Sequence, residues 1–597
     1  MECSMMTFTI DSFRLVFLAI TLIVYAATTT CLPALSRVTK NNQRFLIFHG
    51  LTFLFTIGIF LSADLFTTFC FFELMTLTSF AYVGNDETPF SKKAAMSYLA
   101  YGILGGLVML FGVMLLYFRL GTLDYAKMSM LAEALTNKTD LYIAGACLLF
   151  GFGAKAGMFP LHTWLPKTYM AAPCAGTTVL SAVLSKAGIF GIYLITRSLF
   201  PYDRNWGLAL TVLGCLTMLT GGLLGLFSIH IKRTLACSSM AQIGFILVAI
   251  GTQNSTGAML HTINHSLFKL ILFTVVSMIY SMTGELDYNR LAGFANRKKW
   301  LRIPFLFAAL AISGVPLFSG FISKSLIHEV LSACTIGPNG SMYQLAEYIF
   351  ILSGALTFAY MLKLYFALFH NRSNTDSCPP DTCIAKPDPI SIIVLCVLAS
   401  LCLLFSLWFP GLVIHLEAVA ESGLSLGIGA LIYFLIVHSF MTKETVDNSS
   451  PEITYTAYLD IYPSWLDLEA MIYRPLMTKI LPFLGALFSR MFDRLMDGIC
   501  ILLMKTVLRP VGKSHVKEDH PLAYAVGRMA DGILYIIHVK IRKKPPVTHI
   551  SYSDLLAVGT TEFTRTTRLI LYSVSFGLLM FALGLTAALI YLLVAIH

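Results

Sequence analysis

Apolar segments of about twenty residues recur along this chain, and they restrict its possible structures more than any other feature. An α-helix of that length crosses a hydrocarbon core of about 30 Å. About fourteen such segments lie near residues 13–32, 44–63, 65–84, 94–118, 140–160, 174–199, 207–229, 234–253, 256–282, 302–331, 343–369, 389–409, 422–441 and 567–595. Only helices and closed barrels satisfy their backbone hydrogen bonds in lipid. We therefore predict an all-α, polytopic bundle of membrane-spanning helices.

The composition agrees with a membrane location. Of the 597 residues, 57% are hydrophobic and 12% are charged, about half the charged share of an ordinary soluble domain. The thirteen cysteines are scattered, and the close pair Cys378 and Cys383 lacks the spacing of a metal site. We expect these cysteines to be packing residues, with no iron–sulfur, haem or other cofactor in this chain.

The net charge of +10 is mainly a signal of topology. If the predicted spans alternate in direction, most basic residues between them fall on one side of the membrane. That side holds Arg37, Lys40, Arg44, Lys92, Lys93, Lys167, Lys232, Arg233, Arg290, Arg297, Lys298, Lys299 and Arg302, and the other holds Arg14, Arg119, Lys138, Arg197 and Arg204. By the positive-inside rule the first side is cytoplasmic. We expect a multi-pass protein of the inner membrane with both termini outside, and nucleic-acid binding is not needed to explain the charge.

Residues 442–566 are more polar than the rest and fall on the cytoplasmic side in this topology. Within them, residues 464–510 carry charges at helical spacing between apolar residues, which is typical of a helix lying in the membrane interface. Pro475 and Pro482 should kink or divide this stretch. It could be a simple surface anchor or a strap that contacts a neighbouring subunit. We expect three parts: a bundle over 1–441, a lateral segment over 442–566, and an anchoring span within 567–597.

Ionisable residues inside the apolar segments are the strongest indication of function. A charge at mid-bilayer costs about 2.5–3.5 kcal/mol or more, so such residues are rarely incidental. The predicted relay residues are Glu73, Lys155, Lys186, His261, His265, Lys269 and Lys324. Three of them follow one another at i, i+4 and i+8 and therefore share one helix face. For Lys186 a packing role is an equal alternative.

Three other ionisable residues are expected to lie near the membrane surface. Lys363 is near a helix end, where a lysine can extend its ammonium to the interface. His328 and Glu329 are interpreted in the same way and left out of the relay.

Buried lysines have a chemical use. Loss of water disfavours an ammonium ion, whereas a nearby carboxylate favours it, so moving or neutralising a partner can switch a buried lysine between its two forms. Histidine changes charge near neutral pH. A row of such groups, bridged by water, could pass protons stepwise.

Two of the predicted helices contain residues that interrupt helical pairing. Gly153 and Pro160 flank Lys155, and Gly314 and Pro316 precede Lys324. Non-helical backbone at membrane depth is tolerated where protein or water satisfies it. Paired broken helices are typical of inverted repeats with an ion path between them. We predict repeats over about 44–199 and 207–369.

Four segments resemble the core signature of the complex I antiporter-like subunits. They are GFGAKAGMFPLHTWLPKTYMAAPCAGTTVLSAVLSKAG (151–188), HIKRTLACSSMAQIGFILVAIG (230–251), HTINHSLFKLILF (261–273) and SGVPLFSGFISK (313–324). This superfamily includes the proton-pumping membrane subunits of NADH–quinone oxidoreductase, those of membrane-bound group 4 nickel–iron hydrogenases and formate hydrogenlyases, and the Mrp cation/proton antiporters.

The resemblance implies a role for each relay residue. Glu73 and Lys155 would form a glutamate–lysine pair, Lys269 with His261 and His265 would form the central connection, and Lys324 would be the outlet. Lys186 stands where the hydrogenase and Mrp branches often place a lysine. The tail is similar to the lateral helix and anchor of the distal pumping subunit. Only two spans precede the Glu73 helix, where the family usually has four.

Three functions follow as expectations. The first is a subunit that translocates H⁺ or Na⁺ within a redox-driven complex, with iron–sulfur clusters and nickel–iron or flavin centres in partner subunits and no catalytic redox site of its own. The second is a Mrp-type Na⁺/H⁺ antiporter subunit without redox partners. The third is a membrane scaffold that anchors peripheral subunits through residues 442–566.

Overall fold

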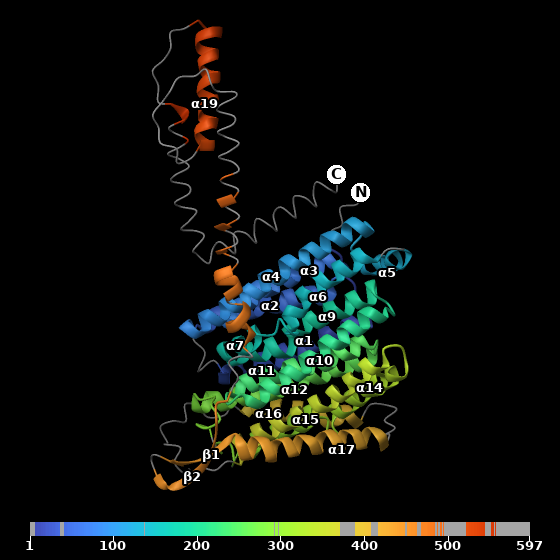
Figure 1. Ribbon diagram of the computed structural model, residues 1–597. Helices are drawn as coiled ribbons and strands as arrows, with labels where there is room; N and C mark the ends of the chain where they lie inside the picture. Colours follow the sequence, from blue (N-terminus) through green and yellow to red (C-terminus); the bar gives the residue numbers. More distant parts are fainter. Residues whose placement is uncertain are drawn as a thin grey trace. The chain divides into compact units, whose positions relative to one another are not determined.

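The computed structural model describes residues 6–35, 41–135, 138–291, 293–296, 298–370, 389–407, 416–447, 450–461 and 467–473, isolated stretches between 475 and 494, and residues 521–543, 551–553 and 556. The chain divides into two compact units, Glu2–Asp467 and Leu468–His597, with Met1 grouped with the second. The first unit is an all-helical bundle apart from one small hairpin, as the sequence predicts for the fold class (Figure 1).

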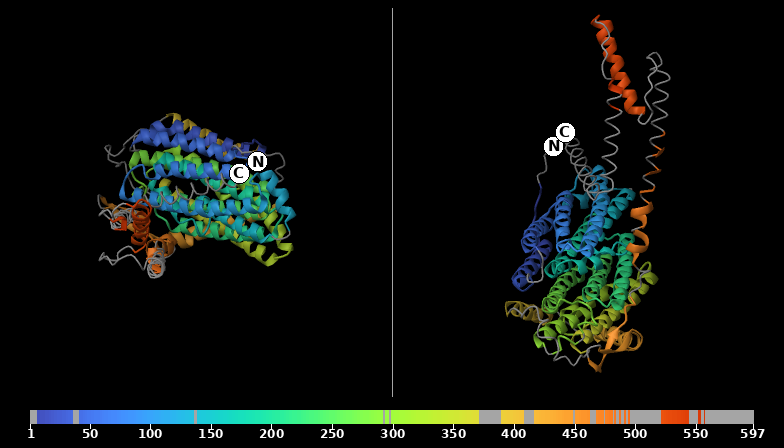
Figure 2. Two further views of the ribbon diagram at one scale, coloured as in Figure 1. Left: turned by 90° about the horizontal axis from the view of Figure 1, so that it is seen from above. Right: turned by 90° about the vertical axis from the view of Figure 1, so that its left-hand side faces the viewer.

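The helices of the first unit run alongside one another (Figure 2). They are α1 (Ser12–Leu35), α2 (Asn42–Leu61), α3 (Leu65–Val83), α4 (Pro89–Leu120), α5 (Tyr125–Ala134), α6 (Thr139–Ala156), α7 (Trp164–Ala171), α8 (Cys174–Val179), α9 (Ser185–Leu199), α10 (Arg204–Phe227), α11 (Ile231–Gly251), α12 (Ser255–Thr283), α13 (Lys299–Ser313), α14 (Ser319–Ala333), α15 (Gly340–Phe369), α16 (Pro389–Leu407) and α17 (Leu416–Leu431). A π-helix, η1 (Leu180–Leu184), joins α8 to α9, a 3₁₀ turn, η2 (Cys334–Ile336), follows α14, and a second π-helix, η4 (Ile432–His438), extends α17.

Ten of the described helices are long and apolar enough to cross a membrane. The predicted spans at 140–160 and 302–331 are not among them; the helix of the first ends at Ala156, and the second is divided between α13 and α14. The apolar stretch of α16 is shorter than a full span. The predicted span at 567–595 lies outside the described residues.

Small residues let α10 and α11 pack closely. A Cβ on Gly207 would lie 2.5 Å from the carbonyl oxygen of Gly251, and a Cβ on Gly214 would lie 2.9 Å from that of Gly244. Such contacts are how membrane helices associate where the hydrophobic effect gives no preference for helix over lipid. The spanning part of α11 is buried along its whole length, so α11 lies in the core of the bundle.

Both segments in which an interruption is predicted contain a helix end, and the two helix ends share one geometry. Gly157 follows the last residue of α6 with φ +82°, and Gly314 follows the last residue of α13 with φ +81°. In each case the amide of the next residue turns back to a carbonyl five positions earlier: Met158 N–H donates to Gly153 O at 2.9 Å, and Val315 N–H donates to Leu310 O at 3.1 Å. This is the Schellman type of helix end, which favours glycine in the left-handed conformation. The inverted repeat itself stays a prediction.

A short hairpin after α17 was not predicted. Strand β1 (Thr442–Asp447) pairs antiparallel with β2 (Ser450–Tyr458). The end of β2 is fixed to the bundle, because Asn289 Nδ2 donates to Tyr458 O at 2.9 Å and Tyr458 N–H donates to Asn289 Oδ1 at 2.7 Å. The hairpin therefore covers part of the bundle.

The second unit has α19 (Pro521–Tyr535), its continuation η8 (Ile536–Ile541), and two short π-helical turns, η6 (Glu469–Tyr473) and η7 (Leu476–Ile480). Much of the predicted amphipathic stretch 464–510 lies outside the described residues, so its course as one helix or several stays a prediction.

Candidate ion relay

All seven predicted relay residues are buried. Glu73 comes from α3, Lys155 from α6 and Lys186 from α9, the two histidines and Lys269 from α12, and Lys324 from α14. The most exposed of the seven, Lys324, has 8% of its surface accessible, and Lys186, His261, His265 and Lys269 have none. Helices from both ends of the bundle thus direct ionisable groups into its interior.

Hydroxyl groups hold the ammonium of Lys155. Its Nζ donates to Tyr98 OH at 2.5 Å and to Thr76 Oγ1 at 3.0 Å. Tyr98 OH in turn lies 2.5 Å from Ser79 Oγ. Glu73 is one turn before Thr76 on α3 and interacts with Lys155 electrostatically. The predicted pair is therefore close in space, but no Glu73–Lys155 ion pair within 4.0 Å is present among the described contacts.

Two glycines on α4 make room for this end of the relay. A Cβ on Gly106 would lie 2.4 Å from Glu73 Oε1, and a Cβ on Gly102 would lie 2.6 Å from Thr76 Cγ2. The absence of these methyl groups is what lets α3 present a carboxylate and a hydroxyl against α4. The spacing of four residues between the glycines is the sequence signal for this contact.

Lys186 lies at the start of α9, just after the π-helical turn η1. Its Nζ donates to Ser181 O at 2.6 Å, within η1. π-Helical turns inside α-helices are often found at functional sites. Lys186 also interacts electrostatically with His261, His265 and Lys269. The structure thus brings Lys186 into the central group.

The three residues of α12 form the predicted stripe. His261 is held between Ser323 Oγ at 2.9 Å and Gln242 Oε1 at 3.1 Å. Lys269 Nζ donates to Leu235 O at 2.9 Å and makes a short contact with Ser238 Oγ. Among the described residues, neither ring nitrogen of His265 has a hydrogen-bond partner. His265 is therefore a buried polar group that water or a transferred proton could engage.

Lys324 binds a backbone carbonyl at the C-terminal end of α13. Its Nζ donates to Ile312 O at 2.9 Å, and the carbonyls of the last helical turn lack partners within their own helix. The ammonium also lies 4.8 Å from the centre of the Phe245 ring. Ser323, the residue before it, contacts His261, so the central group and Lys324 meet across α12 and α14.

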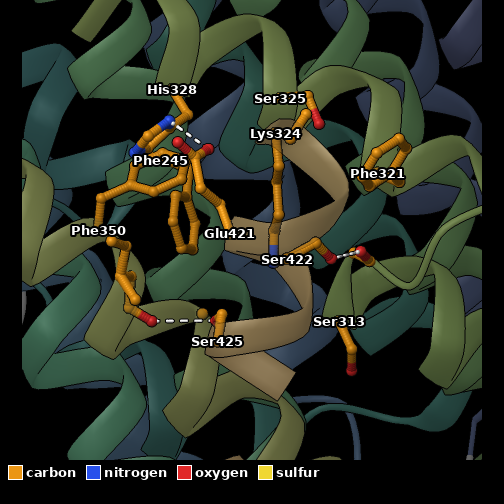
Figure 3. A pocket seen from close by; sticks show the side chains of 14 residues that line it. Phe245, Ser313, Phe321, Lys324, Ser325, His328, Phe350, Glu421, Ser422 and Ser425 are labelled. Carbon is orange, nitrogen blue, oxygen red and sulfur yellow. Dashed lines mark hydrogen bonds and ion pairs between the residues drawn. The ribbon is translucent and has the colours of Figure 1, made fainter. Parts of the chain in front are cut away.

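A cavity of about 50 Å³ adjoins Lys324 (Figure 3). Its lining includes His328 from α14 and Glu421 from α17. His328 is buried within the protein, with 6% of its surface accessible, and its position relative to the membrane surface stays a prediction. The partners of His328 come from α15 and α17, so no local sequence pattern could have indicated this cluster.

The prediction for Lys363 is wrong. Its side chain does not reach an interface but is fully buried, and Nζ donates to Leu226 O at 2.7 Å and Ser228 O at 2.9 Å. The rings of Tyr288 and Tyr458 lie 5.4 and 5.3 Å from the ammonium. Tyr458 belongs to the hairpin, which explains why a lysine near a helix end is covered.

A polytopic bundle with two helices broken beside buried lysines defines an antiporter-like membrane protein. Residues 62–338 match the family described as NADH:quinone oxidoreductase/Mrp antiporter, TM. All seven relay residues fall within the match. The predicted family resemblance is confirmed.

Relatives from several branches are similar to the chain. Hydrogenase-4 component B of Escherichia coli is 30% identical over 375 residues, covering 58% of this chain and 54% of the relative. The putative antiporter subunit mnhD2 of Staphylococcus saprophyticus is 30% identical over 324 residues, covering 53% and 63%. NADH-ubiquinone oxidoreductase chain 5 of Cryptococcus neoformans is 26% identical over 456 residues, covering 75% and 62%. The chain thus spans between 54% and 63% of the length of these relatives.

Two solved structures share the fold. A chain of the Mrp complex from Dietzia sp. DQ12-45-1b matches with a TM-score of 0.58 and 22% identity, over 72% of this chain and 85% of that one. A chain of the membrane-bound sulfane sulfur reductase, an archaeal respiratory membrane complex, matches with a TM-score of 0.59 and 24% identity, over 72% and 84%. These matches confirm the predicted fold class.

Proposed function

We propose that this chain is an ion-translocating membrane subunit of a multi-subunit complex, and that it moves H⁺ or Na⁺ through the buried residues between Glu73 and Lys324. The observation that carries the proposal is the burial of all seven ionisable groups on five helices, each placed where polar atoms or like charges surround it. Such groups are costly to insert and are expected where they serve a translocation path.

The relay would work in three parts. Lys155, held by Thr76 and Tyr98, exchanges a proton with Glu73 at one end. Lys186, the two histidines and Lys269 form a central group in which like charges repel, so a proton arriving on one member drives another off. Ser323 connects this group to Lys324, whose cavity leads onward. Ordered water would bridge the steps that side chains do not span.

The energy source is proposed to be a redox reaction in partner subunits. The relatives named hydrogenase-4 component B and NADH-ubiquinone oxidoreductase chain 5, and the respiratory complex among the structural neighbours, favour this assignment. Iron–sulfur clusters and nickel–iron or flavin centres would then reside in peripheral subunits. The chain would sit in the inner membrane with both termini outside and residues 442–566 on the cytoplasmic side.

A Mrp-type Na⁺/H⁺ antiporter subunit is the second candidate. The putative antiporter subunit among the relatives and the Mrp complex among the structural neighbours favour it. Purifying the native complex and identifying its subunits by mass spectrometry distinguishes the two candidates. Redox subunits would support the first, and membrane subunits alone would support the second.

The translocation role is tested in proteoliposomes that contain the intact complex and a pH-sensitive dye. We expect Lys155→Gln and Lys269→Gln each to lower ion transport at least tenfold, because each removes a proton carrier without changing the size of the side chain greatly. Lys127→Gln is the matched control, since Lys127 is exposed on α5. Normal transport in correctly assembled Lys155→Gln and Lys269→Gln complexes would refute the relay and favour the scaffold function.

A further inference from the structure

His328 lies between two carboxylates that belong to different helices. Its Nδ1 is 2.8 Å from Glu421 Oε2 on α17, and its Nε2 is 3.2 Å from Glu347 Oε1 on α15 (Figure 3 shows the contact with Glu421). The imidazole is 7% exposed, the Glu347 side chain 22% and the Glu421 side chain 41%. We call these three residues the α14–α17 triad. Accessibility increases outward from the histidine, so the triad leads from the interior to the surface.

The triad places one imidazole between two carboxylates. Nδ1 of His328 is 2.8 Å from Glu421, whereas Nε2, at 3.2 Å from Glu347, is buried without a hydrogen-bond partner among the described residues. A neutral imidazole has one nitrogen that donates and one that accepts, whereas a carboxylate only accepts. An imidazole in this position can therefore take up a proton at one nitrogen and pass on the proton of the other to a carboxylate.

The triad is connected to Lys324. Lys324 and His328 are separated by four residues on α14, so they share a face and lie about 6 Å apart along the helix. Both line the cavity of about 50 Å³, which is large enough to hold water, together with Glu421. Phe245 of α11 and Phe350 of α15 also line this cavity. Glu417 of α17 interacts with Glu421 electrostatically. Among the described residues, Lys324 and Glu417 are thus the charged groups that face the triad from its own helix and from α17.

We propose that His328, Glu347 and Glu421 form the proton-release site of this chain. A proton leaves the Lys324 ammonium through water in the cavity and joins the triad, and the triad releases a different proton from Glu421 to the exterior. No electrons move, and one proton enters the triad for each that leaves. In the predicted topology α14 ends on the outer side, which makes this release outward. The inference rests on the proposed translocation function and adds to it a specific exit.

The test uses the intact complex in proteoliposomes with the variants His328→Gln, Glu421→Gln and His328→Ala. We expect proton release to fall at least tenfold in His328→Gln and several-fold in Glu421→Gln. Addition of imidazole should restore release in His328→Ala, because a small base can occupy the vacated space and carry the proton. Glu329→Gln is the control, since Glu329 is the exposed neighbour of His328.

The outcomes separate this inference from the function on which it rests. Normal release in His328→Gln, with transport lost in Lys155→Gln and Lys269→Gln, would overturn the release site and leave the relay intact. A second result would also overturn the proposal: imidazole does not restore release in His328→Ala, and the dependence of the release rate on external pH is the same as in the unmodified complex. That result would assign the triad a structural role. Unaffected transport in every variant would refute the relay itself. Assembly of each variant is verified by size-exclusion chromatography.

Discussion

The hydroxyl of Tyr98 offers the sharpest test of how Lys155 is held. It accepts a hydrogen bond of 2.5 Å from the ammonium, and both groups are buried. The substitution Tyr98→Phe removes this one oxygen and keeps the ring, which also faces the ammonium at 4.7 Å. Thr76 Oγ1 stays as the remaining hydrogen-bond partner. The change therefore isolates a single contact.

The expected magnitude follows from the charge of the donor. A hydrogen bond to a charged group contributes about 1.5–3 kcal/mol, against about 0.5–1.5 kcal/mol for a neutral pair. If the ammonium form of Lys155 is an intermediate of transport, losing this stabilisation should slow the step by roughly 10- to 150-fold. The assay is initial proton uptake into proteoliposomes containing the assembled complex.

A matched control separates the role of Lys155 from the general cost of losing a buried hydroxyl. Tyr288 is also fully buried, and its hydroxyl donates to the neutral Thr234 Oγ1 at 2.6 Å. Tyr288→Phe should cost about 0.5–1.5 kcal/mol of stability and leave transport nearly unchanged. Transport by Tyr98→Phe that equals the rate of Tyr288→Phe would refute the reasoning, because the lysine would then not depend on the hydroxyl.

Two further predictions concern packing. Gly106→Ala should displace the Glu73 carboxylate, because the new Cβ would lie 2.4 Å from Oε1. We expect transport to fall several-fold and the protein to lose about 1–3 kcal/mol of stability. The control is Gly50→Ala, which has no atom within 4 Å of its Cβ and should change neither quantity in the same assays. Lys363→Met should lower stability by about 1–3 kcal/mol in thermal unfolding, because two buried carbonyls lose their donor, and it should leave transport unchanged. Impaired transport by a stable Lys363→Met complex would instead make Lys363 part of the relay.

Local sequence signals were sufficient to find most of the candidate site. Lys155 and Lys324 each stand beside glycines and prolines within apolar segments, and both helices break at the glycine that the Schellman end requires. The stripe of His261, His265 and Lys269 depends only on the helical period. These features are encoded within one helix each, so no knowledge of packing was needed.

Features that depend on contacts between helices were not predictable in the same way. The partners of Lys155 are a tyrosine and a threonine, residue types that are common in apolar segments and carry no signal by themselves. Lys363 was misassigned because its distance from the helix end is a local property, whereas the hairpin that covers it comes from residues 442–458. His328 was missed because its carboxylates belong to α15 and α17.

The balance of buried charges limits how the relay can operate. Within the part of the chain that the structure describes, six lysines are buried, Lys155, Lys186, Lys232, Lys269, Lys324 and Lys363, and Glu73 is the single buried carboxylate. Two like charges 4 Å apart repel by about 4 kcal/mol at the effective dielectric typical of protein sites. The central lysines and histidines have no buried carboxylate among the described residues to offset such repulsion, so a charge on one of them makes a charge on its neighbours less favourable. In the proposed relay, a proton that arrives at one of them therefore favours the departure of another, which is a condition for stepwise transfer towards Lys324.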